Sequence, residues 1–353
     1  MDTLMPKIIR KTSPYLRRPQ ASVTRMMRDV TIALLPVTVF AIWKFGWAAV
    51  VILLLSIISM LVTEYVYYQV VDKVNGETFK FKNKSFSLYN FSALTSGLIF
   101  GLTVPDSTPW YAIVMSGVLG IFLGKLIFGG LGQNVFNPAA LARVLLVVNF
   151  TVASYEIDTV AGVTALGEIS NNLFSSGVLE NFSLIDLFTG IGIPGSIGEV
   201  SFFLILLGGI YLAVRTSFEV RIPLVYVGTV FVLASAVAIY KGLGIWYPMF
   251  HILSGGLIFG AIFMATDPVT SPITKPGRVY FAFALGVVTF FIRIFGSLPE
   301  GVVFAILIMN MFVSSFDYHK WTYSRFTKRQ GVIFGIVILL TILVTIVGVS
   351  YVS

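Results

Sequence analysis

The stretch that decides the fold is LTSGLIFG (residues 94–101), because it recurs as LSGGLIFG (residues 253–260). A second pair follows in the same order, IFGGLGQ at 127–133 and IFGSLPE at 294–300. The two pairs are separated by 159 and 167 residues, which indicates two half-proteins with small insertions. Close packing of small residues between membrane helices is the alternative explanation for either match alone. Two matches in one order favour an internal repeat.

The composition around these repeats is that of a membrane protein. Hydrophobic residues make up 57% of the 353 residues and charged residues 11%, whereas charged residues are about 25% of a soluble domain. Because lipid leaves no water to satisfy backbone groups, the apolar runs predict an all-α polytopic membrane protein with about 10–11 transmembrane helices. The predicted spans are 30–43, 46–69, 91–104, 110–128, 138–150, 201–214, 223–240, 249–265, 279–295, 301–316 and 331–350.

The basic residues orient these spans. They cluster in segments 1–28, 72–84, 215–221, 275–278 and 320–329, and with eleven alternating spans all of these segments lie on one side. The positive-inside rule makes that side the cytoplasm, so the N-terminus is expected there. This clustering also explains the net charge of +8 without a nucleic-acid partner.

Five spans separate the two copies, and an odd number reverses the direction of the second. The prediction is therefore an inverted five-plus-five repeat with interrupted helices, which places binding sites near the midplane at the repeat interface. The predicted organisation is a cytoplasmic basic segment (1–29), a first repeat (30–150), an extracytoplasmic acidic loop (151–200), a second repeat (201–316), and a cytoplasmic basic loop with an extra C-terminal helix (317–353).

The absence of cysteine limits the possible chemistry. No disulfide and no cysteine-ligated iron–sulfur cluster can form within this chain, and its two histidines, His251 and His319, do not indicate a metal site. No catalytic side chain is predicted. Redox chemistry here requires an organic cofactor.

Two polar stretches are candidates for contacting such a cofactor. The first is GGLGQNVFNPAALAR (129–143), in which Asn134 and Asn137 could hydrogen-bond a flat polar ring. The second is FMATDPVTSPITKPGR (263–278), in which Thr266 and Asp267 follow an apolar span. The alternatives are a turn capped by asparagines in the first, and a solvated, helix-terminating carboxylate in the second.

Two further acids are candidates for coupling to ion transport. Glu64 lies inside the apolar run MLVTEYVYYQVV, and Asp317 follows MNMFVSSF. A carboxylate within a span suggests a functional site. For Glu64 the alternative is a side chain that reaches water at the cytoplasmic end of its helix.

Several stretches together resemble one family. They are SPYLRRPQASVTRMMRDVTIALLP (13–36), GGLGQNVFNPAALAR (129–143), PGSIGEVS (194–201), FMATDPVTSP (263–272) and GSLPEGVVFAILIMN (296–310). In this order they are similar to the RnfD family, which belongs to the Rnf electron-transport complexes. The next nearest resemblance is to the homologous NqrB family of the Na⁺-translocating NADH:quinone oxidoreductases.

The resemblance implies a membrane component of a translocase that works between ferredoxin and NAD⁺ and moves Na⁺ or H⁺. The expected location is the cytoplasmic membrane of a bacterium or archaeon. The expected partners are the other Rnf complex subunits (A, B, C, E and G), a flavin transferase and the lipid bilayer.

The resemblance also implies covalent FMN, joined by a phosphoester to a threonine in the pattern Asp-x-x-Ser/Thr-Gly-Ala-Thr. Asp158, Gly162 and Thr164 match that pattern, whereas Ala161 and Val163 depart from it. Thr164 is therefore the predicted anchor. Non-covalent riboflavin is a further expectation. Two alternatives remain: a cofactor-free channel or secondary transporter, which an inverted repeat would equally support, and a scaffold for redox partners.

Overall fold

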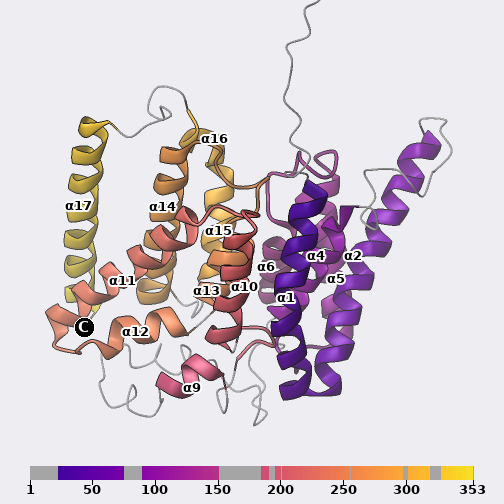
Figure 1. Cartoon of the computed structure of the whole chain (residues 1–353), viewed down its shortest axis with the longest axis horizontal. Helices are drawn as coiled ribbons and strands as arrows, with labels where there is room; N and C mark the ends of the chain where they lie inside the picture. The colour runs from indigo at the N-terminus through magenta and orange to yellow at the C-terminus, as the bar shows by residue number, and fades with distance from the viewer. Residues whose placement is uncertain are drawn as a thin grey trace, which may run out of the picture.

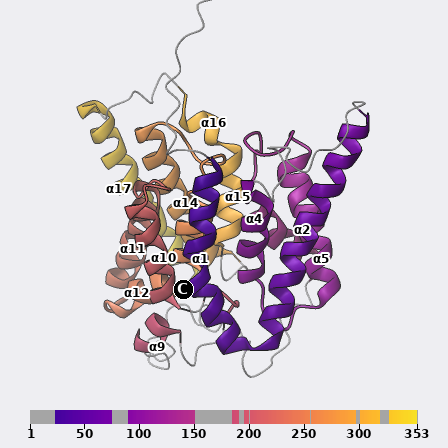
Figure 2. The same ribbon diagram turned by 45° about the vertical axis from the view of Figure 1, so that its right-hand side comes forward.

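The computed structural model describes residues 23–74, 90–150, 184–190, 195–199, 201–254, 256–296, 301–318 and 327–352. All regular elements within these ranges are helices (Figures 1 and 2). The prediction of an all-α polytopic membrane protein is confirmed. The flavin-acceptor residues Asp158, Gly162 and Thr164 lie outside the described residues, as does most of the predicted loop 151–200.

The helices fall into the two predicted sets. The first set is α1 (Val23–Phe45), α2 (Trp47–Val74), α4 (Ser92–Leu102), α5 (Trp110–Ile121) continued by the π-helix η1 (Phe122–Leu126), and α6 (Pro138–Asn149). The second set is α10 (Phe202–Val214), α11 (Arg221–Lys241), α12 (Trp246–Leu253) followed by α13 (Leu257–Phe259) and the π-helix η3 (Gly260–Met264), α14 (Lys275–Phe295), and α15 (Val302–Met311) with α16 (Val313–Phe316). Two further helices are α9 (Leu184–Thr189) and α17 (Lys328–Val352).

Each of the eleven predicted spans overlaps one helix, one continued helix or the bent pair of α12 and α13–η3. Among the described helices, α1, α2, α11, α14 and α17 are long and apolar enough to cross a membrane alone. The pair formed by α12 and α13–η3 is bent by 57°, which is the interrupted helix that the repeat predicts. The helices α4, α5–η1, α6, α10 and α15 are shorter, so non-helical connections reach into the bundle.

The two sets meet through equivalent helices. Along α1, Asp29 lies near Arg215, at the end of α10, and Ala33 lies near Gly208 within it, so α1 and α10 are antiparallel (Figure 1). Further along α1, Lys44 donates to the carbonyl of Gly190, which follows α9. The fifth helices, α6 and α15, also pack against each other. The first helices of the two sets thus pair with each other, and so do the fifth helices. This is the arrangement expected for two copies related by a pseudo-twofold axis.

Glycines in the repeated motif allow close helix packing. A Cβ at Gly97 would lie 2.8 Å from the Cα of Ile57, so α4 approaches the backbone of α2. Gly260, in the second copy, packs against Val302. Small-residue packing, the alternative explanation for the motif, is therefore present together with the repeat.

Charged side chains meet both ends of the break between α12 and α13. The guanidinium of Arg293 donates to the carbonyl of His251 at 2.6 Å and to that of Ser254 at 3.3 Å. On the other side Gly256 has φ +63°, and the Glu199 carboxylate lies within 2.8 Å of where its Cβ would be. A cation at a helix C-terminus and an anion at a helix N-terminus both stabilise unpaired backbone groups.

Candidate functional site

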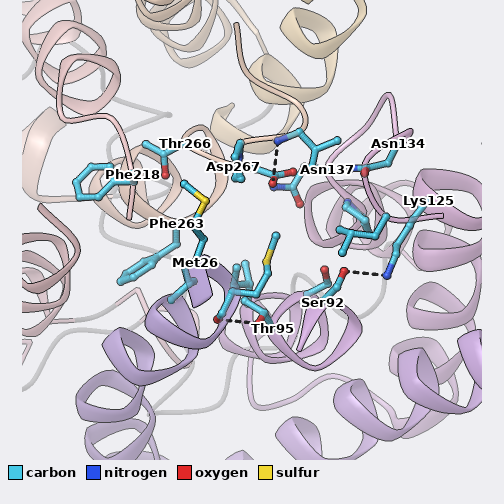
Figure 3. Close-up of a pocket in the computed structure, with 18 of the residues that line it drawn as sticks. Met26, Ser92, Thr95, Lys125, Asn134, Asn137, Phe218, Phe263, Thr266 and Asp267 are labelled. Carbon is cyan, nitrogen blue, oxygen red and sulfur yellow. Dashed lines mark hydrogen bonds between the residues drawn. The ribbon is translucent and has the colours of Figure 1, made fainter. Parts of the chain in front are cut away.

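A small cavity lies between the two sets of helices (Figure 3). Its volume is about 50 Å³, which is room for one or two water molecules. Side chains from α1, α4, α6, η1 and η3 and from three connections line it, and both polar and apolar groups contribute. Four predicted cofactor contacts are among these side chains: Asn134, Asn137, Thr266 and Asp267. The fold thus brings together residues that are more than 120 positions apart in the sequence.

The side-chain amide of Asn137 is hydrogen-bonded to backbone groups of the chain. Its Oδ1 accepts from the backbone of Ala139 at 3.0 Å and of Ala140 at 3.3 Å, which caps α6. Its Nδ2 donates to the carbonyl of Met264 at 3.1 Å, which links the first set to the second. With the Asn310 amide oriented to satisfy its neighbours, Asn310 also accepts from the backbone N–H of Asn137 at 3.0 Å. Asn137 therefore caps the turn before α6, which is the alternative that the sequence left open, and it also links the two repeats.

Asn134 and Thr266 make local contacts at the edge of the cavity. Asn134 Oδ1 accepts from the backbone of Gly132 at 3.4 Å, and its Nδ2 donates to the carbonyl of Phe136 at 3.3 Å. These hydrogen bonds are long, so the amide can exchange them for a ligand at little cost. Thr266 Oγ1 donates to the carbonyl of Ile262 at 2.5 Å, the usual bond of a threonine to the preceding helical turn.

Asp267 lines the cavity and is half-buried, so its carboxylate is only partly solvated. Its Oδ2 accepts from the hydroxyl of Thr270 at 3.0 Å, and its Oδ1 from the backbone of Val269 at 3.4 Å. Burial raises the pKa of Asp267, because desolvation disfavours the charged carboxylate. The two hydrogen bonds and the ammonium of Lys125 oppose that rise.

Glu64 is paired with a residue that the sequence interpretation did not single out. The Lys125 Nζ donates to Glu64 Oε1 at 2.5 Å and to the Ser92 hydroxyl at 2.8 Å. The side chains of Lys125 and Glu64 are 1% and 0% exposed, so Glu64 does not reach water as the alternative proposed. Lys125 lines the cavity and lies in η1, and π-helical turns often occur at functional sites. A lysine inside the predicted span 110–128 is the signal that could have identified it.

A second buried acid, Asp29, was also missed. Its Oδ2 accepts from the Ser217 hydroxyl at 2.6 Å, and Arg25 and Arg215 lie 3.7 and 3.4 Å from its carboxylate oxygens. These contacts join the start of α1 to the connection that follows α10. Phe218 in that connection lines the cavity, so the Asp29 contacts hold one of its walls.

Asp317 lies away from the cavity, where it joins α16 to the start of α14. Its Oδ2 accepts from the backbone of Ile273 at 2.7 Å, and its Oδ1 from the backbone and hydroxyl of Thr274 at 3.0 and 2.6 Å. Thr274 is the N-cap of α14. These contacts are those of a structural anchor, and an ion-coupling role for Asp317 stays a prediction.

The cavity matches a flavin ring in chemistry but not in size. Its amides, hydroxyls and ammonium could hydrogen-bond the polar edge of the ring, and Met26, Phe218 and Phe263 could pack on its faces. A volume of about 50 Å³ is much smaller than the 300 Å³ or more of typical ligand pockets. A ring would enter only after side chains move, and the methionines of α1 are the most adaptable of these.

Comparison with known proteins gives a consistent result. The NQR2, RnfD, RnfE family model matches residues 9–325. The chain is 37% identical to the D subunit of the proton-translocating ferredoxin:NAD⁺ oxidoreductase complex of Clostridium ljungdahlii, over 85% of this chain and 90% of that protein. It is 36% identical to the D subunit of the ion-translocating oxidoreductase complex of Stutzerimonas stutzeri, over 84% and 90%. It is 34% identical to the D subunit of the Na⁺-translocating ferredoxin:NAD⁺ oxidoreductase complex of Acetobacterium woodii, over 92% and 94%.

Proposed function

The chain belongs to the NQR2, RnfD, RnfE family, and from this membership we propose that it is the D subunit of an ion-translocating ferredoxin:NAD⁺ oxidoreductase complex. Its place is the cytoplasmic membrane of a bacterium or archaeon, with the N-terminus in the cytoplasm. The observation that carries the proposal is the similarity to such proteins over most of both chains. The other members of the complex supply the iron–sulfur centres, because this chain has no cysteine. They also supply the nicotinamide site, because this chain has no dinucleotide fingerprint following a strand.

Copurification tests the assignment to a complex. An affinity-tagged full chain isolated from native membranes should bring down iron–sulfur and flavin-containing proteins in fixed ratio. Membrane vesicles that lack the chain should lose ferredoxin-dependent reduction of NAD⁺ together with the Na⁺ or H⁺ uptake that accompanies it. A chain that purifies alone and whose loss leaves both activities intact would support the cofactor-free transporter.

The flavin part of the proposal concerns two positions. FMN is joined by a phosphoester to Thr164, with Asp158 and Gly162 in the acceptor pattern, and a flavin transferase forms the bond. Riboflavin is the second flavin, held without a covalent bond; the cavity lined by Asn134, Asn137, Thr266 and Asp267 would admit its ring only after the surrounding side chains move. Both flavins supply electron transfer, while the chain sets their positions and the charges around them.

Denaturing gel electrophoresis tests the covalent flavin. The wild-type band should fluoresce, a Thr164→Val band should not, and a Thr159→Val band should be unchanged. Fluorescence that survives in Thr164→Val would move the attachment to another residue.

The non-covalent flavin is tested by extracting the native chain with acid and separating riboflavin from FMN by chromatography. Asn134→Leu should reduce the riboflavin released and leave the fluorescence of the gel band unchanged.

Glu64 is the coupling residue that the structure supports best. The Glu64 carboxylate is excluded from solvent and paired with the Lys125 ammonium, so it can exchange that partner for Na⁺ or H⁺ only when the surroundings of the pair change. Coupling requires ion uptake to depend on such a change. Neutralising it as Glu64→Gln should slow electron transfer or remove its cation dependence in the intact complex. Unchanged, ion-dependent turnover would exclude this role.

A further inference from the structure

One wall of the cavity between the repeats is the short connection from α10 to α11. We term residues 215–220 the lid segment. Ser217 and Phe218 line the cavity, whereas Thr216 and Val220 are exposed. Figure 3 shows Phe218 across the cavity from Lys125. The lid segment therefore lies between the cavity and the surroundings of the chain.

Asp29 on α1 holds the first half of the lid segment. Its Oδ2 accepts from the Ser217 hydroxyl at 2.6 Å, and its Oδ1 lies 3.4 Å from Nη2 of Arg215. The Asp29 side chain is 1% exposed, so little water competes for these contacts. Met26, about one turn before Asp29 on the same helix, lines the cavity. The Asp29 contacts therefore close the cavity between α1 and the lid segment.

The second half of the lid segment is held by ion pairs nearer the surface. Glu219 pairs with Arg221 at 3.1 Å and with Arg278 of α14 at 2.5 Å. These three side chains are between 25% and 46% exposed, and ion pairs with that much exposure contribute little to stability. The buried contacts of Asp29 are therefore the stronger of the two attachments.

The backbone of the lid segment is strained at Thr216. Its φ is +53°, in the left-handed region that β-branched residues rarely adopt. The backbone on either side is fixed, because the N–H of Thr216 donates to the carbonyl of Ala213 and that of Ser217 to the carbonyl of Leu212, both at 3.0 Å. Such strain is found at ligand clamps and switch regions. Release of the Asp29 contacts would let Thr216 return to an ordinary conformation.

We propose that the lid segment is the gate of the cavity and that Asp29 is the positioning residue that keeps it closed. The closed cavity, of about 50 Å³, is much smaller than the 300 Å³ or more of typical ligand pockets. Outward movement of the lid segment withdraws Phe218 and enlarges the cavity. The wall that carries Asn137 stays in place, because Asn137 is bonded to Met264 across the repeats. The gate rests on these contacts, and its occupant, riboflavin, rests on the proposed function.

Cysteine labelling tests the gate, and the chain suits it because its sequence contains no cysteine. In the purified full chain in detergent, Phe218→Cys should react slowly with a maleimide, since this position is half-buried and faces the cavity. Addition of Asp29→Asn should speed the reaction about tenfold, because hydrogen bonds to a charged group are stronger than those to a neutral one. Addition of Thr216→Gly should instead slow it, because glycine adopts the left-handed region without strain and so favours the closed lid.

Three controls separate opening of the lid from other effects. Val220→Cys is exposed and should react rapidly with or without Asp29→Asn. Ala282→Cys is fully buried in α14 and should stay unlabelled in both, which shows that the chain has not unfolded. Glu219→Gln removes the exposed ion pairs of the same segment and should change the labelling of Phe218→Cys less than Asp29→Asn does.

Riboflavin exchange tests the occupant separately, by stopped-flow measurement of flavin fluorescence. A gate controls entry and release alike, so Asp29→Asn should speed the binding and the release of riboflavin by similar factors. Asn134→Leu removes a lining contact and should mainly speed release. Faster release alone in Asp29→Asn would contradict the positioning role of Asp29.

Equal labelling of Phe218→Cys with and without Asp29→Asn would overturn the gate, whatever the chain binds. Faster labelling in Thr216→Gly would overturn the part played by backbone strain. Labelling that follows the expected order in a chain that binds no riboflavin would support the gate and overturn riboflavin as its occupant.

Discussion

The Nζ of Lys125 lies 2.5 Å from the Oε1 of Glu64, and neither side chain is exposed to solvent. The two residues are 61 positions apart and join η1 to α2. Lys125 also lines the cavity between the repeats and contributes to the electrostatic environment of Asp267. One buried ammonium therefore connects a carboxylate of α2 to the interface where the two halves of the molecule meet.

Breaking this pair should strongly destabilise the chain. Glu64→Gln or Lys125→Met alone leaves one buried charge without its partner, which typically costs about 3–5 kcal/mol of the free energy of unfolding. The double variant removes both charges and should lose less than the sum. Denaturant unfolding of the purified chain in detergent measures all three. The control is Arg221→Gln, which removes a half-exposed ion pair and should cost at most about 1 kcal/mol. Additive losses from the two single changes would show that the pair is not coupled.

Asn137 should act through two separable contacts. Asn137→Ala removes both the cap on α6 and the hydrogen bond to Met264, and loss of the cap alone costs about 1 kcal/mol. Asn137→Ser keeps a capping oxygen but is too short to donate to the Met264 carbonyl. The alanine variant should therefore unfold at a lower temperature than the serine variant. Asn149→Ala, which removes an exposed amide at the other end of α6, should change the melting temperature least.

Asp267 should make stability depend on pH in the direction opposite to that of most aspartates. Its pKa is raised by burial, so the native chain holds this proton at pH values where the unfolded chain has released it. Its contribution to stability therefore falls as pH rises from the ordinary aspartate pKa through the raised one. Asp267→Asn removes this term and should benefit thermal stability more at pH 8 than at pH 5. Parallel melting-temperature profiles for the two proteins would contradict this account.

Asp317 should prove to be an anchor in a stability measurement. Asp317→Ala removes the acceptor of the backbone N–H groups of Ile273 and Thr274, which water can partly replace, so each lost hydrogen bond should cost about 0.5–1.5 kcal/mol. Asp317→Asn retains acceptor capacity and should lose less. If Asp317 acts only as an anchor, both variants keep the cation dependence of turnover in the intact complex. A shift in that dependence for Asp317→Asn would instead support the coupling role predicted from sequence.

The helices were predictable because their signal is local. Hydropathy located all eleven segments, including the short ones such as α4 and α15, since each apolar run ends at glycine, proline or a polar residue. The repeated LTSGLIFG and LSGGLIFG motifs predicted the reversed second half, which the antiparallel α1 and α10 match. The acceptor pattern around Thr164 lies outside the described residues, so the flavin anchor rests on the family alone.

The site was predictable only in part. Asn137 and Asp267 stood out because polar residues beside an apolar span need an explanation, and the fold places both at one cavity. Lys125 and Asp29 were not singled out, although each stands in or beside an apolar run. The contacts of Asn137 and Asp317 turn out to be those of a cap and an anchor. A hydrogen-bonding side chain at a helix end has the same sequence signature whether its partner is the backbone or a ligand.

The sequence by itself determined the membrane class, the positions of the helices and the inversion of the repeat, because hydrophobic burial and periodicity act over neighbouring residues. Only the tertiary structure decided that Glu64 pairs with Lys125 and that Asn137 reaches Met264 across the repeats. Burial in a medium of low dielectric requires each charge and amide to find a partner. Which partner it finds depends on how helices distant in the sequence pack against one another.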